Sequence, residues 1–265
     1  AAVWAQKANL RLGKDKIAIE KLTEFLKENP KLRKNDRAEA YATLGQAYIN
    51  QEQYPEAADA LYNAGKYTRN KALRGRYYFI AAQLYEKQHQ KDSAEVAFEK
   101  VVKQNWKIPR KLWVEAQAGK ARNKTFTPEE KANFLAYLTK LERRYEHKNY
   151  LDVLYNTHGE LLKDDDKRLA TDFYRSSLSN NKNNNPLKAK AHTRLSELFF
   201  DQKDYTGAYQ HLDSTLTYIP EHTFEHLFIR RKRDNLSKIA ELEYVVKKND
   251  SVLKVMRLPE AERRA

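Results

Sequence analysis

The sequence predicts an all-α fold in which pairs of antiparallel helices stack into a solenoid. A motif of aromatic, Leu, Gly and Ala residues recurs along the chain, and only seven glycines and seven prolines interrupt its 265 residues. So few helix-breaking residues favour long helices joined by short turns. The recurrence indicates a repeat protein in which each helix pair packs on the next one.

The clearest copy of the motif runs from Ala38 to Arg69. Its positions are Tyr41, Leu44, Gly45, Tyr48, Tyr54, Ala57, Leu61 and Ala64. The larger residues fall on one face of each helix, and Gly45 and Ala57 are small enough for the two helices to cross closely. This spacing is that of a tetratricopeptide repeat (TPR), and the sequence therefore predicts a TPR helical solenoid.

Two further copies flank this one. The first spans about residues 1–30, with a turn at Leu12-Gly13-Lys14, and the third spans about residues 76–106. Their expected packing residues are Ala18, Leu22 and Phe25 in the first, and Tyr78, Ala82, Tyr85, Ala94, Phe98 and Val101 in the third. Three consecutive pairs are about the minimum for a stable stack.

The motif weakens between Asn105 and Asn185, a stretch that either bends the solenoid or separates two blocks. We expect a helix around Trp113 and a helix start at residues 127–130, where Thr, Pro and two Glu residues follow one another. A looser pair is predicted from residues 134–141 and 150–161, with Val153 at the position of the small alanine, followed by a separate helix over 169–178.

The last predicted pair has Leu195 and Phe199 in its first helix, then Ala208, Leu212 and Thr215 in its second. A long helix follows over about residues 223–256. Its apolar stripe is Leu236, Ile239, Leu242, Val246, Leu253 and Met256. One interpretation is a capping helix over the final repeat, and the other is that part of the stripe binds a partner helix or groove. The predicted blocks are residues 1–124, 125–221 and 222–265.

Charge and cysteine content narrow the possible functions. The net charge is +14, so nucleic acid, anionic lipid or an acidic protein could be attracted. The densest basic cluster, residues 230–233, lacks the motif context of a nucleic-acid-binding module. The absence of cysteine excludes disulfides and thiolate chemistry. No apolar run reaches the roughly 18 residues of a membrane span.

Short runs in the last third of the chain carry a family resemblance. They are Tyr205-Thr-Gly-Ala-Tyr209, Leu212-Asp-Ser-Thr-Leu216, Arg231-Lys-Arg-Asp-Asn-Leu236, Asn249-Asp-Ser-Val-Leu253 and Leu258-Pro-Glu-Ala-Glu-Arg263. They resemble the SprE/PorW family, the TPR lipoproteins of the Bacteroidota type IX secretion and gliding-motility apparatus. The resemblance implies a periplasmic scaffold associated with the outer membrane, which contacts other proteins of that machine and has no catalytic residue.

Candidate chemical motifs are few. His222 and His226 have the spacing of a zinc site with Glu225 as a base, but no third ligand is visible, so exposed histidines are the simpler interpretation. The acidic run 164–166 lacks the alternation of a calcium loop and is expected to be a solvated turn. His89, His147 and His158 are expected singly on surfaces or at helix ends. The sequence therefore predicts no enzyme, no metal and no cofactor.

The first helices of the pairs predict a binding groove. Outward positions between their packing residues form a mixed polar and basic strip: Lys7, Arg11, Gln46, Asn50, Arg76, Phe79, Gln83 and Lys87. Such a strip suits an acidic or extended segment, although these residues could also be ordinary solvated side chains. The carboxylate clamp of chaperone-binding repeats is not reproduced, because Thr43 and Gln46 stand where it would need other residues.

We therefore expect a non-enzymatic protein-interaction scaffold of the type IX machine, which binds through the groove and the C-terminal helix. The alternative is a generic adaptor for acidic peptide segments, and a third possibility is a nucleic-acid-associated repeat protein. The chain starts at Ala1 without a Met, a signal peptide or a lipid-attachment cysteine. It is therefore expected to be an internal part of a larger protein.

Overall fold

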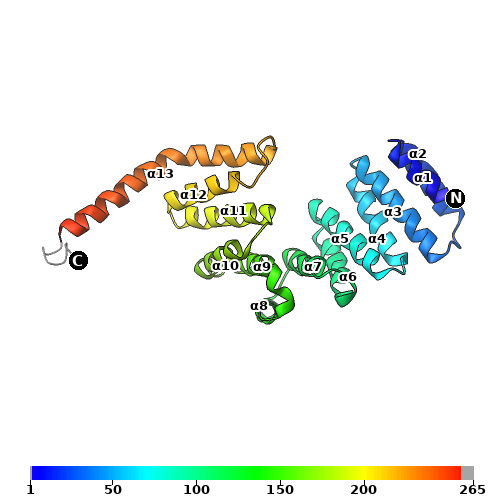
Figure 1. The fold of residues 1–265 in the computed structure, drawn as a ribbon, viewed down its shortest axis with the longest axis horizontal. Coiled ribbons are helices and arrows are strands. Elements are labelled where there is room, and N and C mark those ends of the chain that lie inside the picture. Colours follow the sequence, from blue (N-terminus) through cyan, green and yellow to red (C-terminus); the bar gives the residue numbers. More distant parts are fainter. Residues whose placement is uncertain (1, 258–265) are drawn as a thin grey trace. The chain divides into compact units, whose positions relative to one another are not determined.

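The computed structural model describes residues 2–257 and confirms the all-α prediction. Within that range the regular structure consists of α-helices and two short 3₁₀ segments, and the described residues form no strand. The helices cluster into two compact units, one extending to Tyr150 and one beginning at Leu151 (Figure 1). Within each unit most helices pack against their neighbours in chain order.

The first unit contains eight α-helices. They are α1 (Ala2–Arg11), α2 (Asp15–Glu28), α3 (Lys34–Asn50), α4 (Tyr54–Tyr67), α5 (Lys71–Lys87), α6 (Lys91–Val102), α7 (Arg110–Asn123) and α8 (Pro128–Glu142), with 3₁₀ segments η1 (Asn105–Lys107) and η2 (Tyr145–Tyr150). The pairs α1–α2, α3–α4 and α5–α6 are the three predicted pairs, and their key alanines Ala18, Ala57 and Ala94 are completely buried. α7 packs against both α5 and α6.

Small residues set the close helix crossings, as the motif predicted. A Cβ atom on Gly45 would lie 2.8 Å from Cγ of Leu61, so α3 and α4 approach each other more closely than a larger residue would permit. α6 and α7 also approach closely at a small residue, because a Cβ on Gly119 would lie 2.4 Å from the ring of Phe98. These contacts fix the position of the first helices, on which the candidate site lies.

Four turns inside helix pairs share one backbone geometry. Gly13, Glu52, His89 and Lys203 all have positive φ values, between 58° and 69°. In each turn the next residue donates its N–H to the carbonyl five residues earlier, for example Gln53 to Tyr48 (2.9 Å). This is the Schellman arrangement that ends a helix with a left-handed residue.

The start of α8 also agrees with the sequence. Thr127 Oγ1 accepts a hydrogen bond from the N–H of Glu130 (3.3 Å), and the Glu130 carboxylate accepts one from the N–H of Thr127 (3.0 Å). This reciprocal pair is a capping box, and Pro128 occupies the first turn.

The second unit contains α9 (Leu151–Leu162), α10 (Lys167–Asn180), α11 (Asn185–Asp201), α12 (Tyr205–Leu216) and α13 (Phe224–Met256). The predicted pairing of 134–141 with 150–161 is wrong, because α9 pairs with α10. Gly159 is the small residue of the first helix, where a Cβ would lie 2.7 Å from the Tyr174 ring. Ala170, not Val153, is the fully buried alanine of the second helix.

The predicted capping role of the last helix is confirmed for its first half. Ile229, Leu236 and Ala240 are the buried residues of α13, and they pack on the α11–α12 pair. The second half of α13 extends well past the start of α12 (Figure 1). The predicted block boundaries at residues 124 and 221 separate helices by repeat type, and they stay a prediction. The contacts between helices divide the chain after Tyr150.

Candidate functional site

Two of the predicted groove residues lie on α1. Lys7 forms an ion pair with Glu39 of α3 (3.0 Å), and its ammonium also lies 4.5 Å from the centre of the Trp4 ring. Arg11 is exposed at the last position of the helix. Lys7 is therefore already engaged in holding α1 to α3.

Gln46 and Asn50, the next two predicted residues, are exposed on α3 and hydrogen-bonded to each other. Gln46 Nε2 donates to Asn50 Oδ1 (2.8 Å), and Asn50 Nδ2 donates to Asp15 Oδ1 of α2 (2.7 Å). This polar bridge links successive helices. The first half of the predicted strip is thus tied into contacts within the chain.

The α5 residues are different, because three of the four line a cavity. Arg76, Phe79 and Gln83 form its wall on α5, and the cavity has a volume of about 590 Å³. Phe79 is fixed by an edge-to-face contact with Phe98, with ring centres 5.8 Å apart. Lys87 lies away from the cavity, with its ammonium 3.9 Å from the centre of the Tyr54 ring.

The opposite wall of this groove comes from α7 and was missed in the sequence. Lys111, Leu112 and Glu115 line it, after Pro109 at the helix start. The groove therefore lies between α5 and α7, and its volume falls in the usual range of ligand pockets. The sequence feature that could have indicated this wall is Lys111-Leu112 followed by Glu115 one helical turn later. It stands in the stretch where the repeat motif weakens.

The α5–α7 groove combines an apolar floor with a basic rim. Leu73, Phe79 and Leu112 supply apolar surface, Arg76 and Lys111 place one cation on each wall, and Glu115 adds one carboxylate to the α7 wall. Lys71 starts α5, and the nearby Lys107 ammonium lowers the pKa of Lys71. Such a shift marks a locally positive field at the start of α5.

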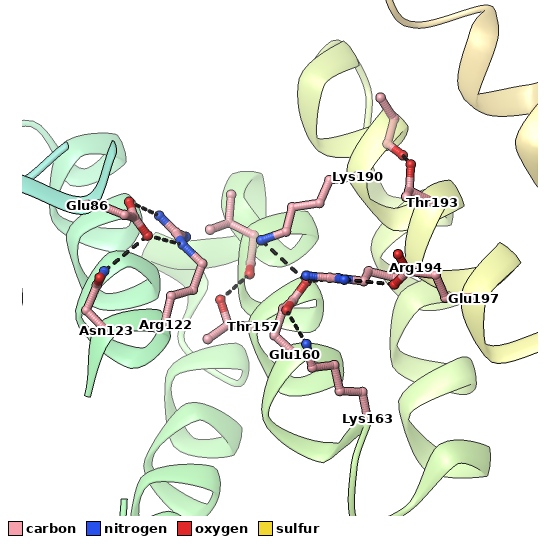
Figure 2. A network of polar contacts seen from close by, with 12 residues as sticks. Glu86, Arg122, Asn123, Thr157, Glu160, Lys163, Lys190, Thr193, Arg194 and Glu197 are labelled. Carbon is pink, nitrogen blue, oxygen red and sulfur yellow. Dashed lines mark hydrogen bonds and ion pairs between the residues drawn. The ribbon is translucent and has the colours of Figure 1, made fainter. Parts of the chain in front are cut away.

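An ion-pair cluster joins α5 and α7 outside the residues that line the groove. Arg122 of α7 forms two hydrogen bonds to the Glu86 carboxylate of α5 (2.9 and 3.1 Å), and Asn123 donates a third to it (3.1 Å). Figure 2 shows this cluster at the C-terminal ends of both helices. The bidentate contact fixes the distance between the two walls.

A second ion-pair cluster joins α9 to α11 in the second unit. Arg194 Nε lies 2.9 Å from Glu160 Oε1, and Lys190 Nζ lies 3.4 Å from the same atom (Figure 2). Burial alone would raise the pKa of Glu160, but the charges of Lys190, Arg194 and Lys163 outweigh it and hold the pKa below its ordinary value. The adjoining cavity is only about 220 Å³. We interpret this cluster as structural.

The residues predicted on the C-terminal helix divide into two groups. Leu236 is buried against α12, so its predicted role in partner binding does not agree with the structure. Ile239 lies at the edge of a cavity of about 430 Å³ between α11, α12 and α13, beside Phe200. The remaining four are exposed, each by between 47% and 63%: Leu242, Val246, Leu253 and Met256.

The histidines do not form a metal centre in the described part of the chain. No group of three or more His, Cys, Asp or Glu residues there lies close enough to hold a metal ion. The expectation that His147 and His158 lie on surfaces is wrong. His147 stacks on Trp113 with ring centres 5.6 Å apart, and His158 stacks on Phe173 at 4.4 Å, so both complete the core.

The acidic run between α9 and α10 is a turn, as expected, and Asp166 caps α10 by accepting a hydrogen bond from the N–H of Leu169 (2.9 Å). No helix among residues 2–257 is long and apolar enough to cross a membrane.

Comparison with known proteins gives matches among solved structures. No protein-family profile and no curated protein sequence matches it. BtubC (BKLC) from P. vanneervenii is 16% identical with a TM-score of 0.49, covering 82% of this chain and 91% of that one. YrrB, described as a TPR protein with an unusual peptide-binding site, is 16% identical with a TM-score of 0.40, covering 76% and 93%. The repeat fold follows from the helix pairs themselves, and neither similarity bears on what this chain binds.

Proposed function

We propose that this chain is a non-enzymatic scaffold that binds partner proteins, with the α5–α7 groove as its main site. The observation that supports it most is the groove's composition. Apolar surface from Leu73, Phe79 and Leu112 is combined with two cations on opposite walls, Arg76 and Lys111, and with one carboxylate, Glu115, on the α7 wall. Such a groove suits an extended segment with an apolar side chain near a carboxylate.

We further propose that the scaffold belongs to the type IX secretion and gliding-motility machine. The resemblance of the runs from Tyr205 to Leu253 to the SprE/PorW family supports this proposal. The last run, residues 258–263, lies outside the described residues. On this proposal the partners are other proteins of the machine, and the location is the periplasm at the outer membrane.

The alternative is a generic adaptor that takes acidic segments from unrelated proteins. The basic rim of the α5–α7 groove favours it equally, because Arg76 and Lys111 would attract any suitable carboxylate. The two proposals predict the same groove chemistry and differ in the identity of the partner.

Groove binding is tested by fluorescence anisotropy with two labelled, extended peptides, one containing Leu and Glu and its twin containing Leu and Lys. We expect the Glu peptide to bind, and Arg76→Glu or Lys111→Glu to weaken it by about tenfold, since each change replaces attraction by repulsion. Lys100→Glu, the same charge change on an exposed position of α6, is the matched control. Equal loss in all three variants would reject the groove as the site.

A single-stranded oligonucleotide in the same assay tests the nucleic-acid possibility. Binding to phosphate would fall steeply with the logarithm of the salt concentration, whereas binding to an apolar floor changes little. Oligonucleotide binding that exceeds peptide binding and shows this steep dependence would replace the scaffold proposal.

Membership of the secretion machine is tested by using the chain as bait in a Bacteroidota cell-envelope lysate. The whole chain is compared with a version that ends at Pro220. We expect secretion-machine proteins with the whole chain. Recovery of cytoplasmic proteins alone would favour the generic adaptor.

A further inference from the structure

The outer half of α13 presents an apolar face that its own chain leaves uncovered. Each described residue from Tyr244 to Arg257 is exposed. The last polar contacts of α13 to the start of α12 come from Glu243, which accepts hydrogen bonds from Thr206, and from Lys247, which pairs with Asp204 (2.9 Å). Beyond this point α13 projects past its neighbours (Figure 1).

The uncovered face has a regular pattern. Its central residues follow at alternating steps of three and four: Ile239, Leu242, Val246, Asn249, Leu253 and Met256. With 3.6 residues per turn, these positions and the adjoining Val245 and Val252 cover about 140° of the helix circumference over about five turns. An apolar stripe of this width and period normally packs against another helix. We call it the α13 stripe.

The α13 stripe is continuous with a cavity at the base of the helix. Ile239 lines the cavity beside Leu236, and the exposed ring of Phe200 on α11 forms its other side. The stripe therefore reaches the edge of this cavity at Ile239. A partner helix lying on the stripe would reach the same edge.

The charge around the α13 stripe distinguishes between a second copy of this chain and an acidic helix as its binding partner. Between Tyr244 and Arg257 there are four basic residues, Lys247, Lys248, Lys254 and Arg257, and one acidic residue, Asp250; Lys247 is paired with Asp204 and Glu243 of its own chain. A second copy would bring the same positive charge alongside, which is repulsive. An acidic helix would be attracted. Asn249, at the middle of the stripe, needs a hydrogen-bond partner when buried, which a polar side chain on a protein helix supplies and a lipid tail does not.

We propose that the α13 stripe binds an amphipathic helix of a partner protein, whose apolar face is flanked by Asp or Glu and carries one polar residue opposite Asn249. This inference deepens the scaffold function proposed above, and it adds a second surface of different chemistry from the α5–α7 groove. The polar pair would fix the register of the two helices, as a single buried Asn does in coiled coils.

The test uses two synthetic helical peptides with the same apolar face and a central Asn, one flanked by Glu and the other by Lys. Anisotropy with the full chain should show the Glu peptide binding at least about tenfold more tightly, because only it complements the basic flanks. Val246→Asp, on the stripe, should weaken this binding by about tenfold or more, since it places a charge in the contact. Val255→Asp is the matched control, because Val255 is similarly exposed on the other side of α13. Helix content is checked by circular dichroism.

Several outcomes would overturn the proposal. They are equal binding of both peptides, binding of neither, or equal damage by Val246→Asp and Val255→Asp. A dimer in light scattering that Val246→Asp alone dissolves would assign the stripe to a second copy. Tighter binding to phosphatidylglycerol vesicles than to the Glu peptide would assign it to a membrane surface. Arg76→Glu should leave helix binding unchanged, so this proposal and groove binding fail independently.

Discussion

The α5–α7 groove and the α9–α11 contact show how one packing arrangement produces either an open or a filled groove. In both, a glutamate on one helix is held by an arginine on the second helix after it: Glu86 by Arg122 and Glu160 by Arg194. In the first unit this ion pair lies at the C-terminal ends of both helices, and a cavity of about 590 Å³ remains beyond it.

In the second unit the ion pair reaches Arg194 in the middle of α11, and a further pair, Lys167–Asp201 (2.7 Å), lies nearby. Only about 220 Å³ remains there. The two ion pairs thus lie at different places along their helices, and the larger cavity accompanies the pair at the helix ends. Four sets of substitutions test the two units, from the largest expected effect to the smallest.

The largest effect is expected for Phe98→Ala. Phe98 is 1% exposed, contacts Phe79 of the groove wall and fills the space beside Gly119. Its removal should lower the free energy of unfolding of the first unit by about 3–5 kcal/mol, measured by urea denaturation. Val96→Ala, half-exposed on the same helix, should change it by less than about 0.5 kcal/mol. Similar losses in both variants would mean that Phe98 does not support the groove.

The second largest effect is expected for Glu160→Ala. It should lower the free energy of unfolding of the second unit by about 2–3 kcal/mol at neutral pH, because Arg194 and Lys190 lose a buried partner. Since the pKa of Glu160 is below its ordinary value, this stabilisation is present above about pH 4.5 and is lost as the pH falls through the folded value. The difference in free energy of unfolding between wild type and Glu160→Ala should therefore disappear as the pH is lowered.

Glu197→Ala, at a more exposed carboxylate that also pairs with Arg194, is the control and should cost less than about 1 kcal/mol. A gap between wild type and Glu160→Ala that stays constant down to low pH would contradict the assigned cause.

The His192–His211 pair gives the second unit a further pH dependence. Burial, followed by the charges of His192 and Arg175, lowers the pKa of His211 to about 4. The stability that comes from a neutral His211 is complete above pH 6.5 and is lost as the pH falls towards 4, by about 1–2 kcal/mol. His211→Asn should reduce this slope in unfolding experiments between pH 7 and 4. His89→Asn, in an exposed turn of the first unit, should leave the slope unchanged.

The smallest effect is expected at helix caps, which the two units share. Thr127→Ala and Asp166→Ala each remove a side-chain acceptor from a helix start, and each should cost about 1 kcal/mol. Thr127→Asn keeps an acceptor and should remain close to wild type in thermal unfolding. A cost for Thr127→Asn as large as for Thr127→Ala would show that the cap contributes little.

The parts of the fold that the sequence predicted are those set by local spacing. Gly45 and Ala57 identify a crossing pair because both small residues stand at fixed distances within one motif. The pairing of α9 with α10 was missed because Val153 was taken for the small residue. Gly159 and Ala170 occupy the two small positions, but the larger residues around them do not repeat the motif.

The candidate site was half predicted for a similar reason. Arg76, Phe79 and Gln83 were found from their positions on a regular repeat, whereas the α7 wall follows an irregular segment and has no motif of its own. Burial of His147 and His158 depends on stacking with Trp113 and Phe173, and this long-range packing leaves no local pattern. Leu236 looked like part of a free stripe because periodicity alone does not show where a helix leaves its support.

The shared turn geometry has a consequence for how such a chain can change its length. Gly13, Glu52 and His89 place the same left-handed joint after the first helix of three successive pairs. Recombination between the gene segments that encode two of these turns would join chain segments that have the same backbone geometry at the junction. One complete helix pair would be added or lost, and the joint itself would keep its geometry. At Glu52 and His89 the joint uses a residue that tolerates this conformation poorly. Glycine at either position should therefore let the turn form with less backbone strain after such a recombination.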